Sequence, residues 1–335
     1  MKQDARTRIE KQLSFLMAEK ENLIIDADTH LTDIKNMAPA FKKRLGETPD
    51  YYQGRPIDSD DLLREMKMSG VNMCLVWQNP AATLYTDNPD ENFNNLLSAN
   101  RYIYRSAVAY PENFIPAGWT DPRALGFDNA VKLASVCVNT FGFGIVKLNP
   151  AQNQFPIDSP MVTDMVKEII KLGAIPAFHY GADTPYTPAS GLESIASRFP
   201  NSPIIAIHMG GGGAGYIEAE ELYQQTRKLG LRNPNIKFVL SAKRDTHIES
   251  DLITYQMAGN PFKSNLFCAS DAPYGRQTWN FGGYRLMFNS LLNGANHTDE
   301  RLRANPELFN KSDISGYMGK NFANMMIERY RQLLQ

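Results

Sequence analysis

The chain has 335 residues, of which 43% are hydrophobic and 21% are charged. This composition excludes a disordered chain, and the length allows one large domain or two ordinary ones. The net charge of -1, from 35 basic and 36 acidic residues, excludes the strongly basic surface that binds nucleic acid or an anionic membrane.

The N-terminal 22 residues are charged throughout and contain no apolar core of signal-peptide length. Apolar residues recur here at helical spacing, so we expect an amphipathic helix that covers one end of the fold or contacts a partner subunit. The sequence therefore predicts a helical extension at 1–22 and a main domain at 23–335. The residues on the apolar face of the predicted helix are Ile9, Leu13, Leu16 and Met17.

Short apolar runs follow along the whole chain, and stretches with a helical pattern separate most of them. Three of the helical stretches, at 59–70, 161–173 and 190–200, end at a Gly or a Pro, as helices commonly do. The predicted strands are 23–28, 71–77, 114–119, 144–149, 175–180, 204–209, 236–242 and 266–271.

These strands are continuous apolar runs, which is typical of parallel strands buried on both faces. Such a series of strand–helix units favours a closed (β/α)8 TIM barrel of the α/β class over an open doubly wound sheet. Segment 279–312, rich in Asn and Gly, is expected to form loop and helix over the barrel mouth. The glycine run at 210–213 lacks the Lys-Ser/Thr of a phosphate loop.

Polar residues stand at the ends of several predicted strands. Asp28 and His30 end the first strand, His179 the fifth, His208 the sixth and Asp271 the eighth. Asp28 and His30 have period-two spacing and share one face of their strand, so both can reach one ion. Imidazole and carboxylate together suit zinc, manganese or ferrous iron. Each residue alone could instead cap a helix or fill a polar core site, but their convergence at one barrel end favours a metal site.

The other histidines and the cysteines have weaker signals. His247 follows the seventh strand and could enter the pocket, whereas His297 is expected at an exposed helix start. The three cysteines lie far apart in apolar runs, so we expect free thiols and a cytoplasmic protein. These cysteines are Cys74, Cys137 and Cys268.

Six motifs, in chain order, resemble the amidohydrolase superfamily, in the branch related to aminocarboxymuconate-semialdehyde decarboxylase and pyrone-dicarboxylate lactonase. The similarity covers nearly the whole chain, from 24 to 334. The motifs are IIDADTHL, GFGIVKLNP, SRFPNSPIIAIHMGGG, PNIKFVLSA, LFCASDAPYG and YMGKNFANMM.

The resemblance implies one divalent metal ion, zinc or manganese, held by Asp28, His30, His179 and Asp271. His208 and Asp271 are the implied acid/base residues. The family usually has a histidine where this chain has Asp28, and the harder, more anionic donor set favours manganese. Lys147 occupies the place where some members of the superfamily have a carboxylated, metal-bridging lysine, a role that is rarer in this branch.

Two enzymatic functions and one other follow from the resemblance. The first is hydrolysis of a small lactone, amide or imide through a metal-activated water. The alternative is non-oxidative decarboxylation of an aromatic or muconate-type carboxylate, and the third is a non-catalytic binding protein on a barrel that has lost its activity. Self-association as a dimer or tetramer stays open, and neither nucleic acid nor membrane is expected as a partner. The residues expected to contact a small-molecule substrate are Trp77, Lys147, Tyr180, Lys243, Arg244 and Tyr274, with Gln78, Asn149 and Arg276 as further candidates.

Overall fold

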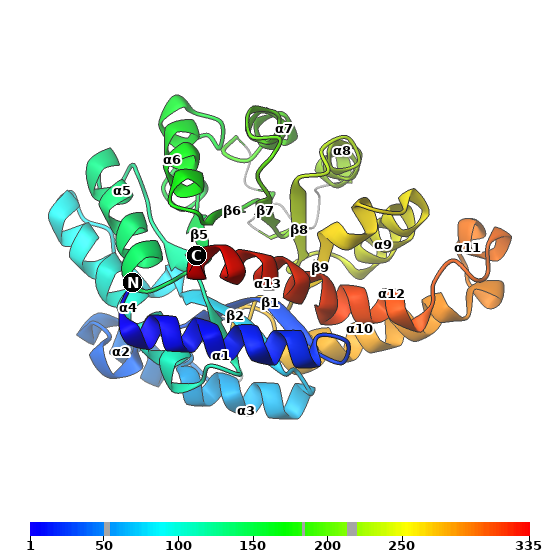
Figure 1. Cartoon of the computed structure of the whole chain (residues 1–335), viewed down its shortest axis with the longest axis horizontal. Coiled ribbons are helices and arrows are strands. Elements are labelled where there is room, and N and C mark those ends of the chain that lie inside the picture. Colours follow the sequence, from blue (N-terminus) through cyan, green and yellow to red (C-terminus); the bar gives the residue numbers. More distant parts are fainter. Residues whose placement is uncertain (50–53, 183–184, 213–219) are drawn as a thin grey trace.

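A computed structural model describes residues 1–49, 54–182, 185–212 and 220–335. Gly213, the last residue of the glycine run, lies outside these residues. Helices and strands alternate along the described chain, as the sequence predicts (Figure 1). The strands are β1 (Ile25–Leu31), β2 (Met73–Gln78), β3 (Phe114–Pro116), β4 (Gly118–Trp119), β5 (Ile145–Leu148), β6 (Ile175–His179), β7 (Ile204–Ile207), β8 (Ile236–Leu240) and β9 (Leu266–Cys268). The α-helices are α1 (Gln3–Glu19), α2 (Pro39–Glu47), α3 (Ser59–Ser69), α4 (Pro89–Ala109), α5 (Phe127–Ser135), α6 (Pro160–Lys171), α7 (Ala189–Arg198), α8 (Glu220–Gly230), α9 (Asp245–Ala258), α10 (Gln277–Leu292), α11 (Glu300–Ala304), α12 (Lys311–Ser315) and α13 (Asn321–Leu334).

The strands form a closed parallel barrel. Neighbours pair in the orders β1-β2-β3 and β4-β5-β6-β7-β8-β9. Only Ala117 separates β3 from β4, and its N–H donates to the carbonyl of Val76 on β2, so β3 and β4 are two parts of one barrel strand. The barrel closes where the N–H of His30 donates to the carbonyl of Ala272, at 2.7 Å. The prediction of a (β/α)8 barrel is therefore confirmed.

The predicted helix boundaries have local causes. Asp58 accepts hydrogen bonds from two N–H groups in the first turn of α3, and Gly70 ends that helix with a φ of 69°. Ser159 accepts from the N–H of Val162 at the start of α6, and Gly173 follows the helix with a φ of 83°. A positive φ suits glycine because it has no Cβ to clash with the backbone.

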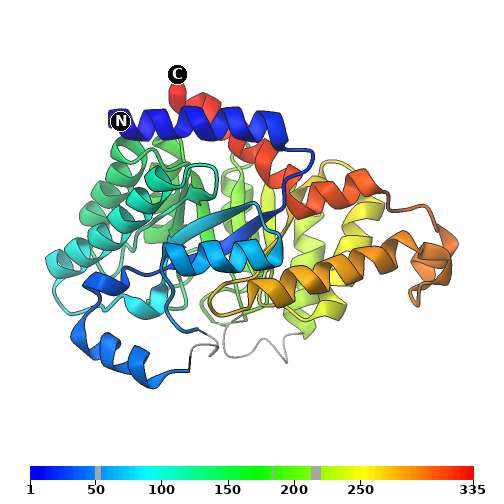
Figure 2. The same ribbon diagram turned by 90° about the horizontal axis from the view of Figure 1, so that it is seen from below.

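The N-terminal helix lies across the end of the barrel at which the strands begin, beside α13 (Figures 1 and 2). The side-chain amide of Gln12 donates to the carbonyl of Phe114 at 2.5 Å, and Arg8 donates to the carbonyl of Gly142 at 2.7 Å. Tyr330 of α13 donates to Gln12 at 2.8 Å. Because these polar residues form part of the buried face, Met17 is 48% exposed, and its predicted place on that face is wrong.

The segment after the last strand covers the barrel mouth only in part. The first turn of α10 lies at the mouth, whereas its later turns pack along α3. Helix α11 and the loop before it project away from the barrel (Figure 1, orange). The prediction that 279–312 forms loop and helix over the mouth is thus correct only near its start. The reason is that α10 buries its aromatic side chains along its length, at Phe281, Tyr284 and Phe288.

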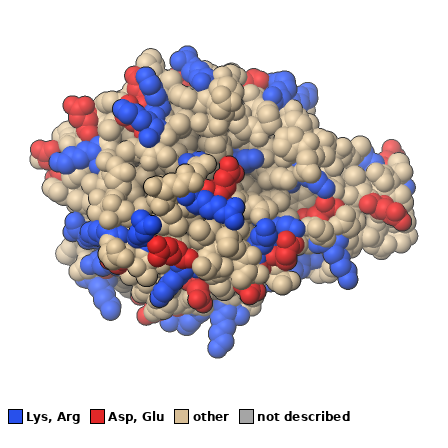
Figure 3. Space-filling model, in the orientation of Figure 1, with Lys and Arg blue, Asp and Glu red and all other residues tan. Residues whose placement is uncertain are grey.

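The face of the molecule seen in Figure 3 has no large patch of charges of one sign. Basic and acidic side chains are interspersed over the face seen in Figure 3, as expected for a chain with a net charge of -1. Among the described residues, no helix combines the length and the apolar character that crossing a bilayer requires. Cys74, Cys137 and Cys268 are buried free thiols, as predicted.

Candidate metal centre and its pocket

A cavity of about 690 Å³ opens at the ends of the barrel strands. Active sites of (β/α)8 barrels form at this end of the strands, because the loops that follow them converge there. The residues that line the cavity are His30, Pro80, Lys147, Asn149, His179, His208, Gly212, Leu240, Ala242, Lys243, Ile248, Ser270, Asp271, Tyr274, Gly275, Arg276, Trp279 and Asn280.

Three predicted metal ligands meet at this cavity. One potential ligand atom of each of Asp28, His30 and Asp271 lies within 4.8 Å of the other two. Nε2 of His30 is 3.6 Å from Oδ1 of Asp28 and 3.3 Å from Oδ1 of Asp271. Asp271 reaches this place from a backbone with a φ of 60°, a conformation that aspartate tolerates better than most residues.

The orientation of His30 fits a metal ligand. Its Nδ1 lies 2.9 Å from the carbonyl oxygen of Gln78. A carbonyl only accepts hydrogen bonds, so Nδ1 donates to it, and Nε2 is the ring nitrogen turned toward the two carboxylates. Histidine ligands of metals are commonly held in this way. One imidazole nitrogen and two carboxylate oxygens fit a divalent cation such as manganese or zinc.

His179 lines the same cavity but is not in the three-residue group found among the described residues. Its ring packs edge-on against that of His208, with 4.8 Å between the ring centres. The role of His179 as a fourth ligand therefore stays a prediction.

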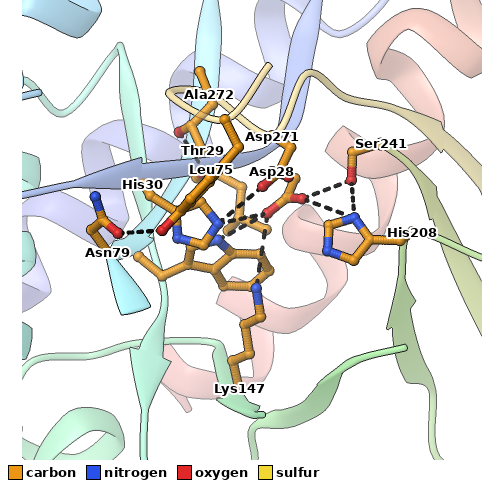
Figure 4. Close-up of polar contacts among 12 residues, drawn as sticks. Asp28, Thr29, His30, Leu75, Asn79, Lys147, His208, Ser241, Asp271 and Ala272 are labelled. Atoms are coloured by element: carbon orange, nitrogen blue, oxygen red, sulfur yellow. Dashed lines mark hydrogen bonds and ion pairs between the residues drawn. The ribbon is translucent and has the colours of Figure 1, made fainter. Parts of the chain in front are cut away.

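Asp28 is fully buried and has hydrogen-bond donors on both oxygens (Figure 4). The indole of Trp77 donates to Oδ1 at 3.0 Å, and the hydroxyl of Ser241 donates to Oδ2 at 2.7 Å. Burial alone would raise the pKa of Asp28, but the nearby Lys147, together with His208 and His30, outweighs it and leaves that pKa below its ordinary value. Asp28 is therefore held as a carboxylate.

Lys147 is a buried cation beside the metal group. Its Nζ lies 4.0 Å from Oδ1 of Asp28. The same atom lies 4.1 Å from the ring centre of Trp77 and 4.7 Å from that of Trp119, within the range of cation–π attraction. Burial lowers the pKa of Lys147, and the carboxylates of Asp28 and Asp271 oppose that effect.

His208 stands opposite His30 across the cavity, on a backbone with a φ of 77°. Such a conformation is uncommon for a residue other than glycine and is found most often at functional sites. Nδ1 of His208 lies 2.8 Å from Oγ of Ser241. Burial lowers the pKa of His208 to about 4, against the opposing effect of Asp271.

The predicted substrate-binding residues divide into two groups. Lys147, Tyr274 and Lys243 line the cavity, and so do the further candidates Asn149 and Arg276. The side chain of Trp77 lies behind the lining, where it supports Asp28 and Lys147.

Tyr180 and Arg244 do not line the cavity. The hydroxyl of Tyr180, just after β6, forms a hydrogen bond with Thr226 of α8 at 3.0 Å. Arg244 pairs with Glu220 and lies 2.8 Å from Nε2 of His247. His247 is thus part of a contact between α8 and α9 and does not enter the cavity.

Lys243 also differs from the expected free cation at the mouth. Its ammonium forms a buried ion pair with Asp251 of α9 and donates to the carbonyl of Met209 at 3.1 Å. Its charge is therefore compensated within the protein. His297 is buried rather than exposed, and its Nδ1 accepts from the N–H of Asp299.

Sequence reasoning missed two residues at the centre of the site, Ser241 and Trp119. Ser241 follows β8 directly, so the rule that polar residues at strand ends form the site could have identified it. Trp119 ends β4 and is the second ring against Lys147. Its position at the end of a strand could have indicated a site residue. An aromatic residue at that position is equally expected to pack in the core, so the sequence does not distinguish the two.

A family model described as amidohydrolase matches residues 25–272. No curated protein matches the chain.

Solved structures of other proteins share the barrel. A dihydroxybenzoic acid decarboxylase from a Polaromonas species, with bound manganese, has a TM-score of 0.63 at 14% identity over 91% of this chain and 97% of that one. The 5-carboxyvanillate decarboxylase of Sphingomonas paucimobilis has a TM-score of 0.61 at 13% identity, with 91% and 98% covered. The 4-oxalomesaconate hydratase of Rhodopseudomonas palustris has a TM-score of 0.58 at 16% identity, with 93% and 98% covered. At these identities the likeness establishes the fold alone.

Proposed function

Because the chain belongs to the amidohydrolase family, we propose that it is a metal-dependent, non-oxidative decarboxylase of a small planar carboxylate. The main support is the donor set, in which Asp28 and Asp271 join a single histidine of the group. Hydrolysis of a lactone, amide or imide is the second candidate.

The charge of this donor set supports decarboxylation over hydrolysis. A bound divalent cation would supply a Lewis acid that polarises a substrate oxygen. Hydrolysis at neutral pH needs strong activation of water, which sites with three neutral histidines provide. Two carboxylates compensate the charge of the cation, which weakens that activation, and the buried ammonium of Lys147 beside them is left as the group that can attract an anionic substrate. Oxygen donors also favour manganese over zinc.

The residues of the chain have separate roles in the proposed reaction. The ammonium of Lys147 would hold an oxygen of the substrate, because it is a buried cation beside the metal group and its ion pair with Asp28 is a loose one, at 4.0 Å. The carboxylate of Asp271, 13% exposed at the cavity, would take a proton from a hydroxyl of the substrate or from water and pass it to the carbon that carries the leaving group. The carbon–carboxyl bond breaks, its electron pair forms the new C–H bond, and carbon dioxide leaves.

A specific observation favours the second candidate. His208 has a pKa lowered to about 4 by burial, so its imidazole is neutral at pH 7 and can accept a proton. A neutral imidazole beside the metal group is a suitable base for the attack of water on a carbonyl carbon.

The two functions are tested by one assay. Protein stripped of metal and reloaded with manganese or zinc is incubated with hydroxybenzoates, muconate-type acids, lactones, amides and imides, and released carbon dioxide and released acid are measured separately. Carbon dioxide from the manganese form supports the proposal, whereas acid without carbon dioxide supports hydrolysis. An Asp28→His variant tests the role of donor charge, since it should lower the rate of carbon dioxide release and shift the metal preference toward zinc.

A further inference from the structure

One hydroxyl lies between the metal group and the candidate base. Ser241 is 1% exposed at the end of β8. Its Oγ lies 2.7 Å from Oδ2 of Asp28 and 2.8 Å from Nδ1 of His208 (Figure 4). Nδ1 of His208 and Oδ2 of Asp28 are themselves 3.8 Å apart, too far for a direct hydrogen bond.

The number of hydrogens determines the direction of both bonds. A serine hydroxyl has one hydrogen to donate, and a carboxylate only accepts. If Ser241 donated to His208, its oxygen would face Oδ2 of Asp28 at 2.7 Å with no hydrogen between them. Ser241 therefore donates to Asp28, and its lone pair accepts from an N–H at Nδ1 of His208.

We propose that Ser241 is a positioning residue that holds His208 in the tautomer protonated at Nδ1, while it orients Asp28 toward the metal. In this tautomer Nε2 of His208 has a free lone pair. His208 lines the cavity, and Nε2 lies on the side of Gly212, where the residue has no side chain to cover it. His208 therefore starts the reaction as a proton acceptor.

This arrangement specifies one proton transfer. An O–H bond of the substrate or of water breaks, its electron pair stays on the oxygen, and the proton forms an N–H bond at Nε2. That step rests on the proposed function, whereas the tautomer of His208 and the orientation of Asp28 do not.

The first test reads the tautomer directly and needs no substrate. The chain has five histidines, so ¹⁵N-histidine labelling and long-range ¹H–¹⁵N correlation resolve each ring in the metal-free protein. We expect a proton on Nδ1 of His208 and none on Nε2. In Ser241→Ala the Nδ1–H loses its acceptor, and we expect a mixture of tautomers.

The second test measures the link to the metal. Because partners of a metal ligand commonly contribute 10–100-fold to affinity or activity, Ser241→Ala should bind manganese about 10- to 100-fold more weakly and should lower kcat more than it raises KM. Ser241→Thr keeps the hydroxyl and should restore the tautomer and much of the affinity. Ser69→Ala is the matched control, since Ser69 is 4% exposed, also has two side-chain hydrogen bonds and lies outside the cavity.

The outcomes are distinct. A proton on Nε2 of His208 in the wild type, or on both ring nitrogens, overturns the proposal. So does a Ser241→Ala protein with unchanged tautomer and manganese affinity, or an equal loss of affinity in Ser69→Ala. The NMR test and the substrate assay can also give different answers. If His208 shows the expected tautomer but the protein acts on none of the substrates, the positioning role of Ser241 stands and the proposed function is rejected. Thermal unfolding of each variant identifies any that fails to fold. If Ser241→Ala does not fold, the tautomer of His208 in the wild type and the manganese affinity of Ser241→Thr test the proposal.

Discussion

Nε2 of His30 lies 3.3 Å from Oδ1 of Asp271, and this contact joins the first barrel strand to the residues that follow the last one. Two backbone hydrogen bonds run beside it, from His30 to Ala272 and from Asp271 to Asp28. The candidate metal centre is thus placed at the seam where the barrel closes. A cation bound there would hold the two ends of the barrel sheet together.

Metal binding should therefore stabilise the fold. At a free manganese concentration 100 times the Kd, linkage adds about 2.7 kcal/mol to the free energy of unfolding. Urea denaturation with and without manganese measures this difference. A midpoint that does not move with manganese would contradict the site.

Replacing His30 by Ala should abolish most of that effect. Since even partners of metal ligands contribute 10–100-fold, we expect loss of a ligand to weaken manganese binding by at least about 100-fold. Bound metal is measured by elemental analysis, and circular dichroism checks the fold. His297→Ala is the control because His297 is also buried but lies outside the cavity, and it should keep its metal.

Replacing Lys147 by Met should separate substrate binding from metal binding. Removal of one partner of a buried charge pair costs about 2 kcal/mol or more, so kcat/KM for a carboxylate substrate should fall at least about 30-fold. Manganese affinity should not fall, because the variant removes a cation 4.0 Å from Asp28.

Lys132→Met is the control for this change. Lys132 also lies over an aromatic ring, that of Phe93, but on α5 and away from the cavity. Its kcat/KM should equal that of the wild type. If kcat/KM of Lys147→Met equals that of the wild type, the ammonium of Lys147 does not bind the substrate.

Lys243→Met should act on stability and not on substrate binding. Breaking a buried ion pair commonly costs 3–5 kcal/mol, and we expect about 3 kcal/mol because Arg227 stays paired with Asp251. The half-exposed pair of Arg244 should contribute about 1 kcal/mol or less, so Arg244→Gln is the milder comparison. Urea denaturation and KM are measured together, and a raised KM with unchanged stability would restore Lys243 as a substrate-binding residue.

The buried carboxyl of Asp121 should make stability depend on pH. Burial raises the pKa of Asp121 to about 6, although its Oδ1 accepts from the N–H groups of Arg123 and Ala124. The folded protein therefore binds this proton more tightly than the unfolded chain, whose aspartates have a pKa of about 4. The proton on Asp121 therefore adds to the free energy of unfolding. This contribution is fully present well below pH 4 and is lost as the pH rises through about 6.

Asp121→Asn removes this titration. The stability of the wild type relative to the variant should fall by about 2 kcal/mol between pH 4 and pH 7, as expected for a pKa that is about two units higher in the folded protein. Urea denaturation at four pH values gives the two curves. Parallel curves would mean that Asp121 titrates alike in the folded and unfolded protein.

Much of the site follows from sequence periodicity. The spacing of Asp28 and His30 puts both on one face of a strand, and parallel strands bring their carboxyl ends to one end of a barrel. That rule was enough to predict that Asp271, far away in the chain, meets them. The barrel itself follows from continuous apolar runs, because strands buried on both faces need apolar residues at every position.

Side-chain direction did not follow from the same patterns. Lys243 and Arg244 stand side by side at a strand end, yet Lys243, although it lines the cavity, pairs with Asp251, and Arg244 pairs with Glu220. A long cationic side chain pairs with whichever acid its neighbours offer, and those acids lie on α9 and at the start of α8.

The sequence by itself determined the order of strands and helices, the barrel and the end at which polar residues gather. Only the tertiary structure decided that Ser241 joins Asp28 to His208 and that two indoles enclose Lys147. The physical reason is range. Periodicity reports which face of an element is buried, whereas hydrogen bonds and ion pairs depend on distances of a few ångströms between side chains from different elements.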